Sequence, residues 1–213
     1  KVIQSHMRDK ANRFFLDTNV AFSPDGKYFA TGGLKETKLW DLATRQEILT
    51  FDGMAYAISF SPDGKHFLCG GPGPMVGFNR QPPRMKIFDV ATGGEFRDIQ
   101  LRSRPFVASS AAYSQDGKYI LAGSTGGEIT LWNASSLKPI KTVVASEGGF
   151  LDSGLVKMVH AVAFSTDGEY ALSGGGDSTV RLWNAKKMTE IKKFVGHSGY
   201  FGVRSVAFSP DSK

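Results

Sequence analysis

Residues 164–184, which read FSTDGEYALSGGGDSTVRLWN, contain the pattern that decides the fold of this chain. Phe164 precedes a Ser-Thr-Asp-Gly segment, and polar and apolar residues alternate from Thr179 to Trp183. A similar segment occurs earlier in the chain, Ser61-Pro62-Asp63-Gly64, and its residue types are those preferred in a type I turn. A tight turn between short apolar runs predicts a β-hairpin, and period-two alternation predicts a third strand.

The same pattern recurs along the whole chain. The turn motif follows an aromatic residue in five places: Phe22, Phe60, Tyr113, Phe164 and Phe208. The first four copies are each followed by a second element: Leu39-Trp-Asp, Ile87-Phe-Asp, Leu131-Trp-Asn and Leu182-Trp-Asn. All three tryptophans of the chain occupy this one repeat position. Two motifs that recur in the same order along a chain indicate a repeat protein.

Each unit is predicted to be a four-stranded antiparallel sheet. In the fourth unit we expect strands at 159–164, 169–174, 179–183 and 189–194, the last being the most polar and therefore the outermost. One such sheet cannot bury both of its faces alone, whereas neighbouring sheets stacked around an axis bury them mutually. The sequence therefore predicts an all-β chain with the architecture of a β-propeller.

These residues resemble the WD-repeat (Trp-Asp repeat) β-propeller family. The resemblance implies a single partial propeller over residues 1–213, with repeats at about 1–50, 51–100, 101–142 and 143–194 and an incomplete repeat at 195–213. With an outer strand near Lys1–His6 and a first strand at Val203–Phe208, this amounts to about four and a half blades. Propellers of this family usually have seven blades, so we expect the chain to be part of a seven-bladed ring.

The resemblance also implies a structural network of His, Ser or Thr, Asp and Trp within a blade. The first repeat offers His6, Thr31 and Trp40; the fourth offers Ser173, Asp177 and Trp183; and the incomplete repeat offers His197. No repeat has the full set. We therefore expect several blades to be held together mainly by apolar packing.

Composition agrees with an ordinary globular protein. The chain has 213 residues, of which 41% are hydrophobic and 22% are charged, which excludes a disordered tail. Its one cysteine, Cys69, excludes an internal disulfide, so we expect an intracellular protein, with a cytoplasmic location. No apolar run is long enough for a membrane-spanning helix, and we expect no membrane insertion.

No motif predicts catalysis, a metal or a cofactor. The four histidines are scattered, and no carboxylates cluster near them as a metal site would need. A hydrolytic triad of Ser173, Asp177 and either His160 or His197 is disfavoured, because no nucleophile elbow or oxyanion-hole motif accompanies it. The sequence therefore predicts a protein that is not an enzyme.

Two departures from the repeat suggest a binding surface. They are the long loop from Gly70 to Arg84 and the loop from Ala145 to Lys157, which we expect on the same face of the propeller. Arginine and aromatic residues are enriched in protein interfaces, and long inserts on a rigid scaffold usually carry function. The candidate partner-binding residues on this face are Met75, Phe78, Arg80, Arg84, Arg102, Arg104, Phe150, Tyr200 and Phe201.

The favoured function is a protein–protein interaction scaffold within a multiprotein assembly. The alternative is contact with RNA or a ribonucleoprotein, through a basic patch with aromatic residues formed by Arg80, Arg84, Lys86, Arg102 and Arg104 beside Phe78 and Phe106. The net charge of +6 is mild and no basic run is long, so nucleic acid is the less favoured partner. A catalytic propeller would need converging carboxylates or metal ligands, which the sequence does not offer.

Overall fold

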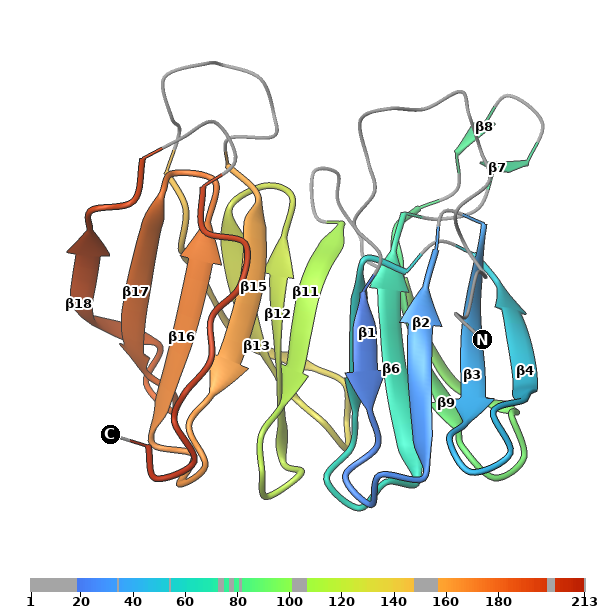
Figure 1. Cartoon of the computed structure of the whole chain (residues 1–213). Helices are drawn as coiled ribbons and strands as arrows, with labels where there is room; N and C mark the ends of the chain where they lie inside the picture. The colour runs from blue at the N-terminus through green and yellow to red at the C-terminus, as the bar shows by residue number, and fades with distance from the viewer. Residues whose placement is uncertain are drawn as a thin grey trace.

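The computed structural model describes residues 19–33, 35–53, 55–72, 75–76, 79–80, 82–100, 107–147, 157–198 and 202–212. Within these residues the chain forms strands β1 to β18 and no helix (Figure 1). Sixteen of the strands make four four-stranded antiparallel sheets, and β7 and β8 pair with each other in a separate hairpin. The prediction of an all-β propeller with four-stranded antiparallel blades is therefore confirmed.

The four blades follow one another in chain order. Blade 1 consists of β1 (Val20–Phe22), β2 (Tyr28–Gly32), β3 (Glu36–Asp41) and β4 (Glu47–Asp52). Blade 2 consists of β5 (Ala57–Phe60), β6 (His66–Gly71), β9 (Arg84–Asp89) and β10 (Glu95–Gln100). Blade 3 consists of β11 (Ala108–Tyr113), β12 (Tyr119–Ser124), β13 (Glu128–Asn133) and β14 (Pro139–Val144). Blade 4 consists of β15 (Val159–Phe164), β16 (Tyr170–Gly175), β17 (Thr179–Asn184) and β18 (Thr189–Val195).

The repeated turn motif is held together by its own side chains. In blade 2, Ser61 Oγ donates to Asp63 Oδ1 (2.6 Å) and accepts the backbone N–H of His66 (3.0 Å). Gly64 has a φ of +68°, a conformation that glycine adopts without strain. The Ser61 hydroxyl holds the pKa of the Asp63 carboxyl below its usual value, so the carboxylate stays charged as a turn acceptor. The same Ser–Asp pairs occur in the corresponding turns at Asp25, Asp116 and Asp167.

The hydrophobic core lies between the blades. Leu39 of blade 1 packs with Phe67 of blade 2, and both are fully buried. Further round, Met85 packs with Ile120, and Leu131 with Ala171. Each blade therefore buries its face against the next one, as the stacking argument predicts.

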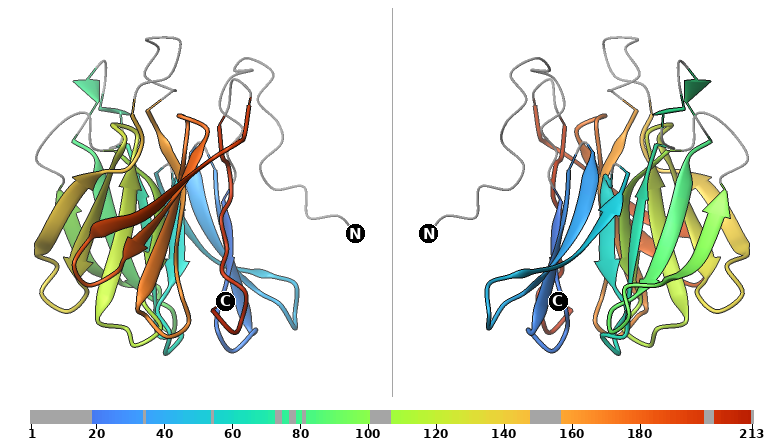
Figure 2. Two further views of the ribbon diagram at one scale, coloured as in Figure 1. Left: turned by 90° about the vertical axis from the view of Figure 1, so that its left-hand side faces the viewer. Right: turned by 90° about the vertical axis from the view of Figure 1, so that its right-hand side faces the viewer.

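The blades stand side by side around an axis, with the first strand of each innermost and the fourth outermost (Figures 1 and 2). The inner strands are neighbours: β1 contacts β5, β5 contacts β11, and β11 contacts β15. The Ser-Pro-Asp-Gly turns lie at the lower end in Figure 1, and the links between the second and third strands lie at the upper end.

The strand expected at Val203–Phe208 is wrong, because this segment has no strand pairing in the structure. It runs beside β16, where the Gly174 backbone leaves space for Val203 and Val206: a Cβ on Gly174 would lie 2.8 Å from Val203 Cγ1. The Val203 N–H donates to the Gly175 carbonyl at the end of β16 (2.9 Å), but no ladder of backbone pairs joins the segment to a strand within the described residues. The strand expected near Lys1–His6 lies outside the described residues, and the seven-bladed ring stays a prediction.

Candidate functional site

Blade 2 carries the one large insert between a second and a third blade strand among the described strands. Residues 72–83 separate β6 from β9, whereas three residues link the second and third strands in each of the other blades. The insert contains β7 (Met75–Val76) and β8 (Asn79–Arg80), paired as Met75 with Arg80 and Val76 with Asn79. Figure 1 shows this hairpin standing above the upper end of the blade. The end of the propeller that carries β7 and β8 is called the upper face below.

The candidate partner-binding residues fall into two groups. The backbone of Met75 and Arg80 lies in the hairpin on the upper face, and Arg84 begins β9. The other candidates lie outside the described residues: Phe78, Arg102, Arg104, Phe150, Tyr200 and Phe201.

Two cations of the expected basic patch have carboxylate partners. Arg84 Nη1 lies 2.6 Å from Asp98 Oδ2, and Lys86 Nζ lies 2.6 Å from Glu95 Oε2. Both carboxylates come from β10, the outer strand of the same blade. Because these pairs cancel charge locally, Arg84 and Lys86 add little net positive potential for a polyanion.

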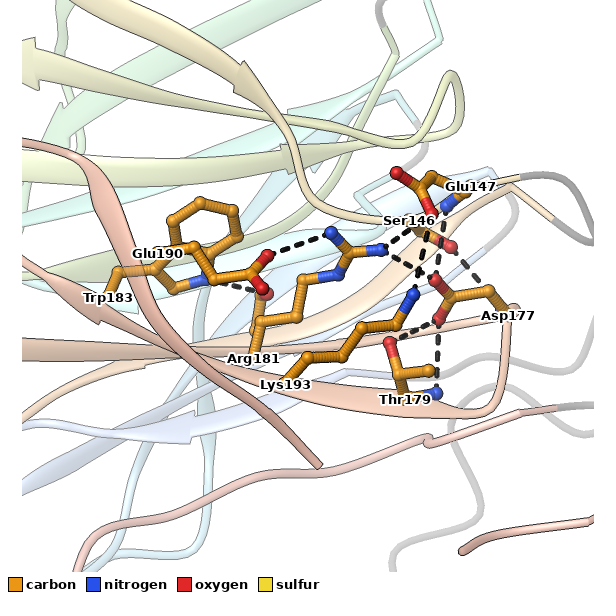
Figure 3. A network of polar contacts seen from close by, with 9 residues as sticks. Ser146, Glu147, Asp177, Thr179, Arg181, Trp183, Glu190 and Lys193 are labelled. Carbon is orange, nitrogen blue, oxygen red and sulfur yellow. Dashed lines mark hydrogen bonds and ion pairs between the residues drawn. The ribbon is translucent and has the colours of Figure 1, made fainter. Parts of the chain in front are cut away.

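A second polar cluster ties blade 4 to the connection from blade 3 (Figure 3). Its centre is Arg181 on β17, whose side chain is only 6% exposed. Arg181 pairs with Asp177 Oδ2 (3.2 Å), Glu190 Oε2 (2.9 Å) and Glu147 Oε2 (3.3 Å). The Arg181 guanidinium holds the pKa of the Glu147 carboxyl below its usual value. Lys193 also reaches Glu147 Oε2, at 3.4 Å.

The turn between β16 and β17 is held from both sides. Asp177 Oδ1 accepts the N–H (3.1 Å) and the hydroxyl (2.8 Å) of Thr179. The Asp177 N–H donates to Ser146 Oγ (3.3 Å), and the Glu147 N–H donates to Asp177 Oδ2 (3.1 Å). Ser146 and Glu147 follow β14, so these contacts fix the passage from blade 3 to blade 4.

Sequence analysis missed Ser146, Glu147, Arg181 and Glu190 as members of this cluster. A signal for Arg181 was present: it stands two residues before Trp183 on an alternating strand, so both side chains lie on one face. Trp183 is buried on that face, and a buried cation needs counter-charges. The partners Ser146 and Glu147 are more than 30 residues away in sequence, and no local pattern indicates them.

The residues expected in the structural network are arranged as two Trp–hydroxyl pairs. Trp183 Nε1 donates to Ser173 Oγ (2.9 Å), and Trp40 Nε1 donates to Thr31 Oγ1 (3.0 Å). Asp177 contacts Arg181 and Thr179 instead of these tryptophans. His197 is exposed after β18, and His6 lies outside the described residues. The two pairs and the Arg181 cluster are structural supports for the blades.

Blade 3 lacks the corresponding acceptor. Trp132 Nε1 is buried and has no hydrogen-bond partner among the described residues. Trp132 pairs with Ile120 on β12, and the position two residues further along β12, which is Ser173 in blade 4, is Ala122. In blade 2 the tryptophan itself is replaced by Phe88, which needs no acceptor.

Replacing Ala122 by serine is expected to raise the free energy of unfolding by about 1 kcal/mol, because the new hydroxyl can accept the Trp132 N–H. Chemical denaturation of the variant and the unmodified chain measures the change. In a Trp132→Phe background the same serine should give no gain, because the donor is absent. An equal gain in both backgrounds would contradict this explanation.

A cavity of about 470 Å³ opens at the opposite, lower end between blades 2 and 3. Asp63, His66 and Phe96 of blade 2 face Tyr113 and Leu137 of blade 3 across it. Burial raises the pKa of the Tyr113 phenol, so this group stays protonated. Among the described residues no group of three or more His, Cys, Asp or Glu side chains could hold a metal ion.

The fold and the repeated Trp–hydroxyl pairs define a class of protein built from WD repeats, and the comparison with known families agrees. The pattern described as WD domain, G-beta repeat matches residues 18–41, 103–133, 153–184 and 188–213, which together make up more than half of the chain. The chain belongs to this family, whose members generally act as scaffolds for protein interactions. The longest unmatched stretch, residues 42–102, contains blade 2, with Phe88 and the insert.

Three relatives are described as WD-repeat proteins or as associated with a ribonucleoprotein. WD repeat-containing protein 70 of Xenopus laevis is 29% identical over 123 residues, covering 56% of this chain and 19% of that protein. U3 snoRNP-associated protein-like EMB2271 of Arabidopsis thaliana is 27% identical over 207 residues, covering 78% and 43%. WD repeat and SOCS box-containing protein 1 of Homo sapiens is 30% identical over 205 residues, covering 91% and 44%. The chain therefore spans less than half the length of these relatives.

The part of the chain that the structure describes contains no helix of the length and apolar character needed to cross a membrane.

Proposed function

We propose that this chain is a non-catalytic, intracellular scaffold that binds other proteins of a larger complex through loops on the upper face. The observation that carries the proposal is the β7–β8 hairpin, which projects from blade 2 where the other blades have three-residue links. A rigid frame limits the conformational entropy lost when such a loop binds. Family membership and the names of the relatives support a role in assemblies.

The proposal assigns the loop residues to binding and the blades to support. Met75, Phe78 and Arg80 belong to the insert, and they combine the residue types found at the centres of protein interfaces. The proposal adds Arg102, Arg104, Phe150, Tyr200 and Phe201, which belong by sequence to the connections after β10, β14 and β18. Arg84 serves mainly as a support in this scheme, because Asp98 neutralises it.

Shortening the insert tests the proposal. Residues 72–83 are replaced by Gly-Asp-Ser, the link that joins β16 to β17 at Gly176 to Ser178. We expect the proteins captured by the unmodified chain to be lost, while the free energy of unfolding changes by less than about 1 kcal/mol, since loop length has a weak effect on stability. A matched control replaces Ala43 and Thr44, in a lower-end turn of blade 1, by glycines. Capture of the same proteins by the shortened chain would place the binding surface elsewhere.

Contact with a ribonucleoprotein is the second candidate, because one relative is described as U3 snoRNP-associated. Since Arg84 and Lys86 are paired with carboxylates, such a site would depend on Arg80, Arg102 and Arg104. Binding to RNA through these cations should weaken steeply as salt is added, whereas capture of a protein through an apolar interface should not. A salt titration of the captured complex therefore separates the two candidates.

A further inference from the structure

The outer edge of blade 4 is an exposed strand. All seven residues of β18 are exposed, and β18 pairs only with β17 in the described sheet. Figure 1 shows it at the outer left of the molecule, away from the β7–β8 hairpin. Such an edge presents a row of backbone N–H and C=O groups that can pair with the backbone of another extended chain.

The same strand exposes apolar side chains. Ile191 is 51% exposed, Phe194 is 43% exposed and Val195 is 79% exposed. Added contacts with such side chains would accompany backbone pairing if another strand lay beside β18.

The edge also carries positive charge that the described residues do not neutralise. Lys192 Nζ lies over the Phe194 ring, 5.1 Å from its centroid, and has no carboxylate partner within the described residues. Lys187, in the turn before β18, likewise has no such partner for its ammonium group among those residues. Lys141 of β14 reaches across from blade 3 and donates to the Lys187 carbonyl (2.8 Å), which places its ammonium group beside the turn that precedes β18.

The outer strand of blade 1 differs in charge. β4 has the sequence EILTFD, with acidic residues at both ends and no lysine or arginine. β18 has the sequence TEIKKFV; its one carboxylate, Glu190, is paired with the buried Arg181, and of its two lysines Lys193 is paired with Glu147 while Lys192 has no carboxylate partner among the described residues. β4 of blade 1 therefore lacks the lysine that β18 presents at its edge, whereas β10 of blade 2 carries Arg97 over the Phe96 ring, 4.6 Å from its centroid.

We propose that β18 binds an extended, acidic segment of a partner protein, which adds to blade 4 as a fifth strand. Backbone hydrogen bonds to the free edge would hold the segment, and its carboxylates would lie near Lys141, Lys187 and Lys192. This surface lies on the rim and is separate from the upper-face loops. Lysines on an edge strand discourage pairing with another basic strand, whereas they attract an acidic one.

The test uses the full chain and a fluorescent eight-residue peptide in which glutamate and valine alternate. Fluorescence anisotropy at low salt should show saturable binding, and the same peptide with lysine in place of glutamate should not bind. The variant Lys187→Glu with Lys192→Glu should weaken binding at least about tenfold, because like charges then face each other. The control Lys27→Glu with Lys118→Glu makes the same change in net charge on exposed lower-end turns and should bind as the unmodified chain does.

Backbone pairing is tested separately from charge. Two further peptides keep every side chain but carry N-methyl groups on alternate backbone amides, in one frame or the other. A strand added to β18 uses only alternate amides toward its neighbour, so one frame should lose at least about tenfold in affinity and the other much less. Equal binding of both methylated peptides, or unchanged binding of the Lys187→Glu, Lys192→Glu variant, would overturn the proposal. Self-association of the chain that this variant abolishes would assign the edge to a second copy and would also overturn it.

Discussion

Replacing Phe67 by alanine is expected to lower the free energy of unfolding by about 3–5 kcal/mol. Phe67, on β6, is fully buried. Its ring lies 5.3 Å from the ring of Phe51 in blade 1, and 5.6 Å and 5.3 Å from those of Phe60 and Phe88 in blade 2. Truncation would leave a cavity where two blades meet, and the three remaining rings cannot all move inward to fill it.

Denaturant titration measures the effect, with Phe96→Ala as the matched control. Phe96 is on β10 of the same blade but is 50% exposed, so its removal should cost less than about 1 kcal/mol. Similar losses for the two variants would show that burial between blades is not the source of stability.

Replacing Arg181 by methionine is expected to lower the free energy of unfolding by about 3–5 kcal/mol. The Asp177 side chain is only 7% exposed, and in this variant its carboxylate would lose the guanidinium that compensates its burial. Glu190 and Glu147 would lose the same partner, but they are more exposed and solvent can hydrate them. The main cost is therefore assigned to Asp177.

A double-mutant cycle by chemical denaturation checks this assignment. Asp177→Asn in the Arg181→Met background removes the uncompensated charge and should recover part of the lost stability. As a control, Lys186→Met breaks the Lys186–Glu169 pair on the surface of the same blade, where Lys186 is 62% exposed, and should cost less than about 1 kcal/mol. No recovery in the double variant would contradict the role given to the Asp177 charge.

The strands were predictable because their signals are local. The turn residues Ser165, Asp167 and Gly168 bond within five residues of one another, and the predicted strands of the fourth repeat agree with β15 to β18 within one residue. Trp183 stands two residues beyond Arg181, and the alternation of a strand alone predicts that both side chains lie on the same face. Neither feature requires knowledge of the neighbouring blade.

The prediction at Val203–Phe208 shows where local reasoning ends. The segment ends in the same Phe-Ser-Pro-Asp sequence as the first strands of the first two repeats, yet it forms no strand in the structure. A strand is completed by a ladder of hydrogen bonds to a neighbour, and the described residues show only the single bond from the Val203 N–H to the Gly175 carbonyl. The local pattern favours a strand, but a strand forms only where a neighbouring strand is available to pair with it.

By itself, the sequence determined the repeat, the four-stranded blades and the stacking of their apolar faces, because turn chemistry and alternation act over a few residues. Only the tertiary structure decided which charges are cancelled and which are exposed. Arg84 is neutralised by Asp98, Arg181 is enclosed by carboxylates from both sides of the blade junction, and Lys192 is left over an aromatic ring on an open edge. The Arg84–Asp98 and Arg181–Glu147 pairs join side chains from different strands or connections, and only the folded blades bring them together.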